Sequence, residues 1–348
     1  MTIGLLIPPY NLTISNHHFF TISSKETELL TESYYFSLAS KRVTMIRLNV
    51  QSETSPLSAV ILGTAMNNGA TPLPQDAYDP KSLEHILAGT YPKEQDMRAE
   101  LACFHEVLER YGVQVYRPEV IDGLNQIFTR DIGFVIDNCF VKSNILPDRA
   151  REWQAIQHII QQINPSNFKV PPPEAHIEGG DVILWKEYIF VGTYLNSDYR
   201  DIQTARTNME GVRFIQEQFP YREVRAFDLI KSNTDPRANA LHLDCCFQPI
   251  GPQQAIVYPG GFRNPKDYQF IQQLFGKSNL FEIDAEGMYQ MYSNVFSISP
   301  QIVVSEQRFT RLNEWLTERG ITVEEIPYHE IGKQEGLLRC STLPLIRK

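Results

Sequence analysis

The sequence lacks the features that define several large classes of protein. Its 348 residues include 32 Lys and Arg against 41 Asp and Glu, a formal charge of −9. Because it has no basic excess to neutralise phosphates, a nucleic-acid partner is not expected. No apolar run is long enough to span a bilayer, so a membrane partner is not expected either. The acidic balance weakly favours the approach of a cation.

Cysteine is also scarce. The five cysteines are Cys103, Cys139, Cys245, Cys246 and Cys340, an odd number without regular spacing. This pattern excludes a disulfide framework of the usual kind. It favours a reducing, cytoplasmic location, in which a reactive thiol would stay free.

The length suits one large domain or two smaller ones. The segment from Met1 to about Leu30 has neither the charged start nor the small-residue cleavage site of a signal peptide, and residues 1–44 are predicted to be an N-terminal extension of unknown role. No linker rich in Pro or Ser divides the rest. Residues 45–348 are therefore predicted to be a single domain.

A unit of two strands, a helix and a third strand recurs along the chain. The paired strands are expected within 133–141, 182–191, 242–258 and 295–304, and the helices over 149–163, 204–218, 265–275 and 306–319. A period of roughly 50–70 residues suggests internal duplication. The fold class is therefore α/β, and an ordinary mixed sheet is the alternative to a repeat.

The two ends of the chain supply the parts of a fifth unit. Residues 60–63 and 113–116 read as strands around a helix over 93–111, and the final strand is expected over 337–346. A ring closed in this way would place Cys340 beside the strands that carry Asp131, Glu178 and His242.

Three short motifs carry side chains suited to chemistry. They are Phe128-Thr129-Arg130-Asp131, Glu178-Gly179-Gly180-Asp181 and His242-Leu243-Asp244. If the last lies on a strand, His242 and Asp244 share a face. Two glycines allow a tight turn or the close approach of a ligand. Each motif has a structural alternative, namely a turn-capping aspartate, a hairpin turn or a core histidine. Together with Cys340 they favour a cysteine-nucleophile enzyme that acts on a cation.

In their order along the chain, these motifs resemble the guanidino-group modifying enzymes of the pentein fold. The chain looks most similar to arginine deiminases and dimethylarginine dimethylaminohydrolases. The resemblance extends from Ser58 to Ile346 and includes Arg206-Thr207-Asn208, Asn294 and the Gly-Leu-Leu-x-Cys-Ser segment that contains Cys340. It implies a five-bladed α/β propeller, which agrees with the repeat.

The resemblance also implies roles for the residues. Cys340 would be the nucleophile, His242 the acid and base, and Glu178 the group that orients the imidazole, while Asp131 and Asp244 would hold the guanidinium. A guanidinium is planar and permanently charged, so it needs paired carboxylate hydrogen bonds to be positioned. Attack would give a covalent S-alkylthiouronium, and water would release a ureido product. No metal or cofactor is implied.

Further residues are candidates for binding the rest of the substrate. Arg206 could hold an α-carboxylate or could be a solvated charge at a helix start. Asp181 and Arg130 are also predicted to bind substrate. Arg339 could favour the thiolate or could point outward. The segment from Thr193 to Ile202 is an insertion relative to arginine deiminases, expected where the substrate tail sits.

The predicted function is hydrolysis of the guanidino C–N bond of arginine or an Nω-substituted arginine, giving citrulline plus ammonia or an alkylamine. Three alternatives stay open: an amidinotransferase that passes the amidino group to an amine, a non-catalytic pentein that only binds, and a zinc site built from His242, Asp244 and a cysteine. The expected partner is a small guanidino compound, and the sequence is compatible with a homo-oligomer.

Overall fold

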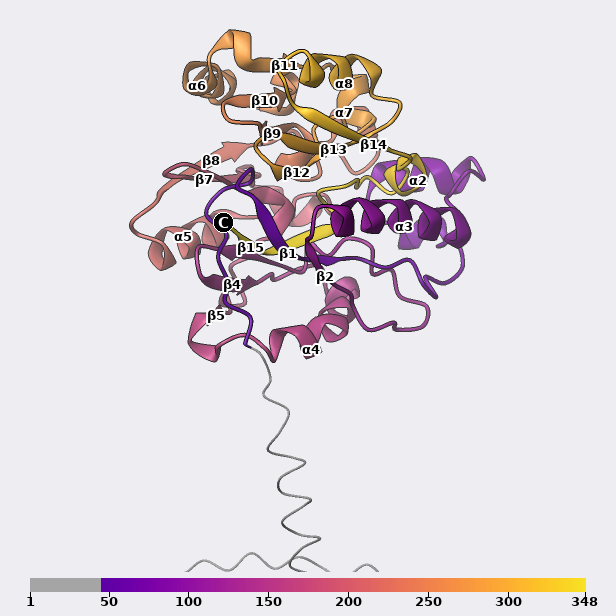
Figure 1. Ribbon diagram of the computed structural model, residues 1–348. Helices are drawn as coiled ribbons and strands as arrows, with labels where there is room; N and C mark the ends of the chain where they lie inside the picture. Colours follow the sequence, from indigo (N-terminus) through magenta and orange to yellow (C-terminus); the bar gives the residue numbers. More distant parts are fainter. Residues whose placement is uncertain (1–44) are drawn as a thin grey trace, which may run out of the picture. The chain divides into compact units, whose positions relative to one another are not determined.

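The computed structural model describes residues 45–348, drawn in colour in Figure 1. The predicted extension over residues 1–44 lies outside these residues. Among the residues described, no helix is both long and apolar enough to cross a membrane.

Residues 45–348 contain five sheets of three strands each, and all five share one topology. In every sheet the middle strand pairs antiparallel with one neighbour and parallel with the other. The sheets are β15 (Thr342–Arg347), β1 (Leu57–Leu62) and β2 (Gln114–Tyr116); β3 (Gly133–Ile136), β4 (Cys139–Lys142) and β5 (Phe168–Lys169); β6 (Val182–Trp185), β7 (Tyr188–Thr193) and β8 (Glu223–Asp228); β9 (Phe247–Ile250), β10 (Gln254–Val257) and β11 (Leu280–Glu282); β12 (Phe296–Ser299), β13 (Ile302–Glu306) and β14 (Thr322–Ile326). The mixed α/β class predicted from the sequence is confirmed.

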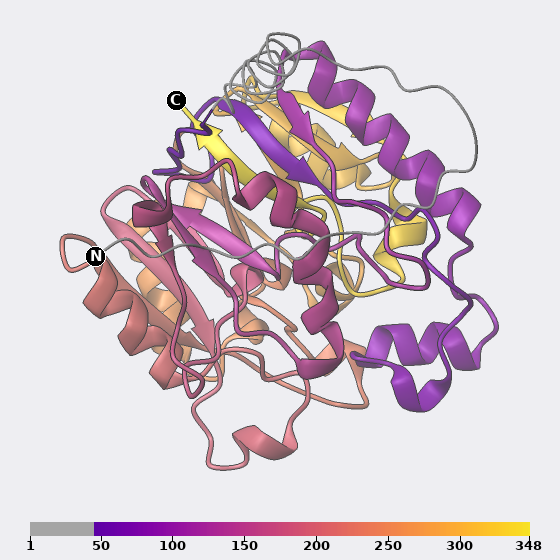
Figure 2. The ribbon, with the colours of Figure 1, turned by 90° about the horizontal axis from the view of Figure 1, so that it is seen from below.

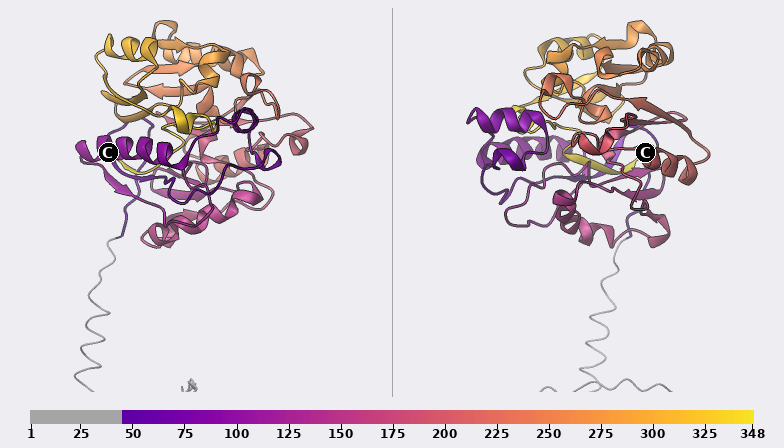
Figure 3. Two further views of the ribbon diagram at one scale, coloured as in Figure 1. Left: turned by 90° about the vertical axis from the view of Figure 1, so that its right-hand side faces the viewer. Right: turned by 180° about the vertical axis from the view of Figure 1, so that it is seen from behind.

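Helical segments precede the parallel third strand of each sheet, as a parallel connection requires. They lie around the outside of the sheets in Figure 1, and in Figure 3 the sheets of residues 247–326 lie together at the top. These segments are α3 (Glu94–Arg110), the 3-10 helix Pro147–Ile156 with α4 (Gln157–Ile160), α5 (Met209–Gln218), α6 (Pro265–Phe275) and α8 (Thr310–Thr317). The remaining α-helices are α2 (Pro80–Leu87), α7 (Ala285–Tyr289) and α9 (His329–Gly332).

The sheet β15–β1–β2 joins the two ends of the described chain. Strands β1 and β15 lie side by side (Figures 1 and 2), with Leu62 opposite Thr342. Just before β15, the backbone oxygen of Cys340 accepts a hydrogen bond from the Arg130 amide at 3.1 Å. The predicted fifth unit is thus present, and it brings Cys340 to the segment that carries Asp131.

Two predicted strands begin later than expected. His242 directly precedes a 3-10 turn over Leu243–Cys245, so the prediction that a strand gives His242 and Asp244 one face is wrong. The amides of Cys245 and Cys246 bond back to His242 and Leu243 rather than across a sheet.

The last strand likewise starts at Thr342 and leaves Cys340 in a turn. The turn forms because the Asn294 side-chain oxygen accepts the amides of Leu337 and Cys340, at 3.2 and 3.1 Å, and so replaces sheet partners. Both corrections place His242 and Cys340 at tight turns, where a tertiary contact fixes the backbone.

Candidate active site

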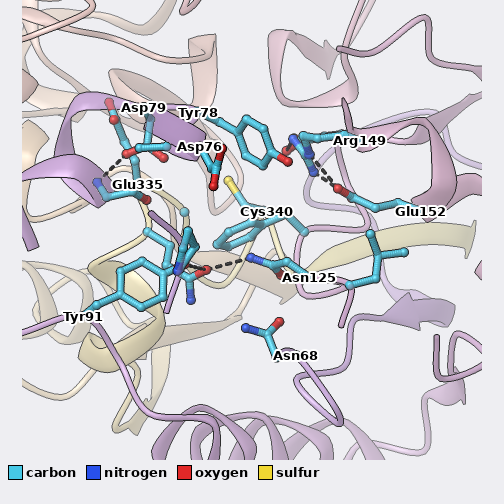
Figure 4. Close-up of a pocket in the computed structure, with 18 of the residues that line it drawn as sticks. Asn68, Asp76, Tyr78, Asp79, Tyr91, Asn125, Arg149, Glu152, Glu335 and Cys340 are labelled. Atoms are coloured by element: carbon cyan, nitrogen blue, oxygen red, sulfur yellow. Dashed lines mark hydrogen bonds and ion pairs between the residues drawn. The ribbon is translucent and has the colours of Figure 1, made fainter. Parts of the chain in front are cut away.

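Cys340, His242 and Asp131 come from three distant segments and line one cavity of about 330 Å³. Figure 4 shows the Cys340 sulfur near the middle of this cavity, close to the side chains of Asp76 and Tyr78, with Arg149 on the other side. Glu178 lies behind the imidazole and holds it. The thiol, the imidazole and the carboxylates predicted to act together are therefore brought together.

The imidazole of His242 is fixed from three sides. Its Nε2 lies 2.8 Å from Oε2 of Glu178, and its Nδ1 lies 3.8 Å from Oδ1 of Asp131. The ring packs on Gly180, where an added Cβ would come within 2.6 Å of the ring atoms. The second glycine of the Glu178 motif is therefore required by the close approach of the histidine.

The charges around His242 favour its protonated form. Burial lowers the pKa of His242, but Asp131 and the hydrogen bond to Glu178 outweigh it, so that the pKa lies above its usual range. For Glu178 the effects have the opposite sign: burial raises the pKa of its carboxyl group, but Arg206 and His242 lower that pKa to about 2. Both shifts favour a protonated imidazole beside an ionised carboxylate, the state in which the histidine can donate a proton.

The thiol of Cys340 is held by Asn294 and Asp244. The side chain is 3% exposed, Asn294 Nδ2 donates to Sγ at 3.2 Å, and Oδ2 of Asp244 lies 3.7 Å from Sγ. Burial, followed by the charges of Asp244 and Asp131, raises the pKa of the Cys340 thiol well above its usual range. A cation placed beside the sulfur would offset these carboxylates and favour the thiolate.

Asp131 presents a buried acceptor to the cavity. It is 4% exposed, and its Oδ2 accepts a hydrogen bond from Arg149 at 2.8 Å. Its Oδ1 has no hydrogen-bond partner among residues 45–348. An unsatisfied buried carboxylate oxygen is costly, so a charged donor in the cavity would be bound strongly there.

Asp244 and Arg339 form a buried pair next to Cys340. Arg339 Nη1 donates to Oδ2 of Asp244 at 2.7 Å, and its other nitrogens donate to Glu53 at 3.0 and 3.1 Å. The outward direction considered for Arg339 is wrong, because these two carboxylates hold it inside. Asp244 borders the sulfur but is not among the residues that line the cavity. Its predicted contact with the substrate stays a prediction.

Two residues predicted to bind substrate lie away from the cavity. Asp181 accepts from the Leu243 amide at 2.9 Å and from the Thr207 hydroxyl at 2.6 Å, so it fixes the turn that carries His242. Arg130 is buried against the carbonyl of Arg339, 3.4 Å away. Neither lines the cavity, and their predicted contact with the substrate stays a prediction.

Arg206 does line the cavity, but its guanidinium is already engaged. Nη1 lies 3.4 Å from both oxygens of Glu178, and Nη2 and Nε donate at 2.8 Å to the carbonyls of Tyr78 and Gln203. The solvated alternative is excluded, since the side chain is buried. Binding of an α-carboxylate by Arg206 stays a prediction, and would compete with Glu178.

Several lining residues were missed by the sequence motifs. Arg149 donates to Glu152 through two nitrogens, at 2.7 and 2.8 Å, as well as to Asp131. The spacing of Arg149 and Glu152, three residues apart in a helical segment, was a readable signal. Asp79 could also have been found, because Asp followed by Pro80 marks a helix start.

The insertion from Thr193 to Ile202 does not contribute to the cavity, contrary to expectation. It forms the end of β7 and a 3-10 turn over Tyr199–Asp201, where the Tyr199 hydroxyl lies 3.2 Å from Nδ1 of His176. Residues 68–91 line the cavity instead. The insertion was misplaced because nothing in its sequence shows which neighbouring element it packs against.

Asp131, Glu178 and His242 offer ligand atoms within 4.8 Å of one another, close enough to consider a metal ion. This set differs from the zinc alternative of His242, Asp244 and a cysteine. Arg206 lies 3.4 Å and Arg149 4.0 Å from the same Glu178 oxygen. Two guanidinium groups at this distance would repel a dication, so the site fits a metal poorly.

The fold and this constellation define a pentein of the guanidino-group modifying superfamily. Residues 92–347 match the family described as N,N dimethylarginine dimethylhydrolase, eukaryotic, and the chain belongs to that family. The predicted superfamily is thereby confirmed.

Individual relatives agree with this placement. The chain is 30% identical over 244 residues to the uncharacterized protein YkgA of Bacillus subtilis, covering 70% of this chain and 77% of that protein. It is 23% identical over 310 residues to an arginine deiminase of Bacillus cytotoxicus, covering 76% and 71%.

Solved structures are similar in fold. The N-terminal domain of ArgZ, a cyanobacterial arginine dihydrolase, aligns with a TM-score of 0.68 at 19% identity, over 83% of this chain and 97% of that chain. The inosamine-phosphate amidinotransferase StrB1 of Streptomyces griseus aligns with a TM-score of 0.65 at 17% identity, over 86% and 97%.

Proposed function

We propose that the protein hydrolyses the guanidino C–N bond of arginine or an Nω-substituted arginine through a covalent intermediate on Cys340. The unpartnered Oδ1 of Asp131, in the cavity that Cys340 and His242 also line, carries the proposal. The arginine deiminase and the arginine dihydrolase among the relatives support it. We also propose that the five sheets are the blades of a five-bladed propeller.

The substrate guanidinium would donate to Asp131 and lie against the sulfur of Cys340. Burial, Asp244 and Asp131 hold the pKa of the thiol high, and the positive charge of the substrate would offset them, so that the thiol would lose its proton to solvent as the substrate binds. The thiolate would attack the central guanidino carbon and form a C–S bond and a tetrahedral adduct. Protonated His242 would then give its proton to the departing nitrogen, so that the C–N bond breaks and ammonia or an alkylamine leaves.

The second half reaction would use His242 as a base. Having lost its proton, the imidazole would remove one from water, and the hydroxide would attack the S-alkylthiouronium carbon. The C–S bond would break and release a ureido product such as citrulline, with the thiolate restored. Glu178 would hold the ring at 2.8 Å through both steps and stabilise its charged form.

Amidino transfer is the second candidate, because the aligned StrB1 structure is an amidinotransferase. An amine would take the place of water in the second half reaction. Arginine would then yield ornithine, and the amidino group would appear on the acceptor.

A single incubation series separates the candidates. The protein is incubated with arginine alone and with arginine plus glycine or another amine, and products are identified by mass spectrometry. Citrulline without an acceptor is expected. If ornithine forms, and only when an acceptor is present, the reaction is amidino transfer and not hydrolysis. If no product forms and the Cys340 thiol is unreactive, the non-catalytic alternative is favoured.

A further inference from the structure

The cavity carries more negative than positive groups. Five carboxylates line it, against the guanidinium groups of Arg149 and Arg206; the carboxylates belong to Asp76, Asp79, Asp131, Glu152 and Glu335. Both guanidinium groups are already paired with buried carboxylates, Arg149 with Asp131 and Glu152 and Arg206 with Glu178. The carboxylates in excess are therefore those that form no ion pair with a cation of the described chain.

Glu335 is the buried member of this excess. It is 4% exposed, and its backbone has a φ of 55°, a left-handed conformation that costs energy for a residue other than glycine. Asn239 Nδ2 donates to its Oε1 at 2.7 Å. Its Oε2 is buried and has no hydrogen-bond partner within residues 45–348. The side chain is thus oriented by one oxygen, while the other is left open at the cavity wall.

Asp79 lies next to Glu335 in the cavity wall (Figure 4). Its side chain caps α2 by accepting from the Ser82 amide at 2.6 Å. Burial, then the charge of Asp79 and the hydrogen bond that the two carboxyl groups form when one of them is protonated, raise the pKa of Glu335 well above its usual range. The two carboxyl groups therefore need a positive charge between them to ionise together.

The nearest cation does not supply it. The charge of Lys81 lowers the pKa of Glu335, but Lys81 forms neither an ion pair nor a hydrogen bond with Glu335 and is directed elsewhere. The Lys81 ammonium donates to the carbonyl of Tyr289 and lies 4.5 Å from that ring's centre. It faces a second cavity shared with His85 and Lys333.

We propose that Glu335, supported by Asp79, binds an ammonium group at the tail of the substrate. This inference rests on the proposed function, since it assigns the second end of the same substrate. Asp131 and Glu335 each keep one buried carboxylate oxygen without a partner in one cavity. A molecule with a guanidinium at one end and an ammonium at the other satisfies both, whereas a tail carrying only a carboxylate would meet Asp79 and Glu335 with like charge.

Four guanidino compounds of similar length test the assignment: arginine, 4-guanidinobutylamine, 5-guanidinopentanoate and butylguanidine. The first two carry an ammonium, the third only a carboxylate and the last no charge at its tail. Binding is measured by calorimetry to the full chain carrying Cys340→Ser, which cannot turn the compounds over, and kcat/KM is measured with Cys340 intact. We expect 5-guanidinopentanoate to bind at least tenfold more weakly than the two ammonium compounds.

Glu335→Gln then separates a receptor from a structural residue. We expect it to weaken arginine and 4-guanidinobutylamine by about 10- to 100-fold, the size of a hydrogen bond to a charged group, and butylguanidine by less than threefold. Glu335→Asp should restore part of the loss because it keeps the charge. Glu325→Gln, at an exposed position, is the matched control.

Other results would refute either the ammonium receptor, or hydrolysis, or both. Equal losses for all four compounds, or no loss with arginine, would refute the ammonium receptor while leaving hydrolysis intact. If Cys340-containing protein turns over none of the compounds, yet Glu335→Gln still selectively weakens the ammonium compounds, hydrolysis fails and the receptor stands. If none of the compounds binds, both proposals fail.

Discussion

The two ends of the cavity differ in how their charges are balanced. Around the end of the cavity near Cys340, where the guanidinium is proposed to bind, the carboxylates have cationic partners within the protein: Asp131 has Arg149, Glu178 has His242 and Arg206, and Asp244 has Arg339. At the tail end, Glu335 and Asp79 lie together without one. The reacting end is thus held in position by the protein itself, while the tail end depends on the ligand for its balance.

The largest effect is expected at the nucleophile. Cys340→Ser should lower kcat by about 10⁴-fold or more, because a hydroxyl in this site cannot act as the thiolate does. Thermal melting should stay near that of the parent, since serine fits the same volume and can still accept from Asn294.

The half-buried Cys103, remote from the cavity, offers the matched control Cys103→Ser. A Cys340→Ser rate within tenfold of the parent would remove Cys340 from the reaction and leave the reacting end without a function.

The next effect concerns the support of His242. Glu178→Gln should lower kcat by about 10³- to 10⁴-fold, by loss of the ring's orientation and of its charge stabilisation. Because Glu178 raises the pKa of His242, the variant should also move the alkaline fall of kcat/KM to lower pH.

The exposed Glu187→Gln serves as the control for Glu178→Gln. An unchanged pH profile with a lowered rate would mean that Glu178 acts only on the fold.

The same pair gives stability a pH window. The pKa of His242 is raised by folding, so its contribution to the free energy of unfolding is full below about 6.5 and is lost as pH rises through the folded value. The pKa of Glu178 is lowered to about 2, so its contribution is present above the ordinary value of 4.5 and is lost as pH falls towards 2. In urea unfolding from pH 3 to 9, Glu178→Gln should lose the acid part of this pH dependence and weaken the alkaline part, to which Asp131 also contributes.

A smaller effect is expected for Asp131→Asn. The amide keeps one acceptor oxygen but loses the charge that pairs with the guanidinium, so kcat/KM should fall by about 10²-fold, the range seen when one preorganised electrostatic contact is lost. Steady-state kinetics with arginine measures it. Asp76→Asn, an exposed carboxylate at the same cavity, should change kcat/KM by less than threefold. Equal losses in the two variants would mean that the cavity acts by its overall charge rather than through Asp131.

The smallest effect is expected on removal of metals. Dialysis against a chelator should leave kcat/KM within a factor of two, because Arg149 and Arg206 occupy the positions from which a dication would be repelled. Activity that disappears and returns with zinc would overturn the reading of Asp131, Glu178 and His242 as a proton-transfer and substrate-binding group.

The motifs predicted which residues come together in the candidate site, but not the backbone conformation at each of them. The order of Asp131, Glu178, His242 and Cys340 along the chain carried the family resemblance, and the strand pairs followed from apolar alternation. The residues after His242 and before Cys340 were predicted as strands for the same reason. They form turns instead, because Asp181 and Asn294 bind their backbone amides across distances of 62 and 46 residues.

The sequence by itself determined the class of chemistry, because a thiol, an imidazole and carboxylates in this order are written in the residues. It also determined the repeating units, because each unit depends only on the local pattern of apolar and polar residues and on turn residues. Only the tertiary structure decided which carboxylates are balanced. The packing of distant segments determines which carboxylates pair with Arg149, Arg206 and Arg339. The same packing leaves one oxygen of Glu335 without a partner. Charge balance depends on distances between segments far apart in the chain, and no local pattern records those distances.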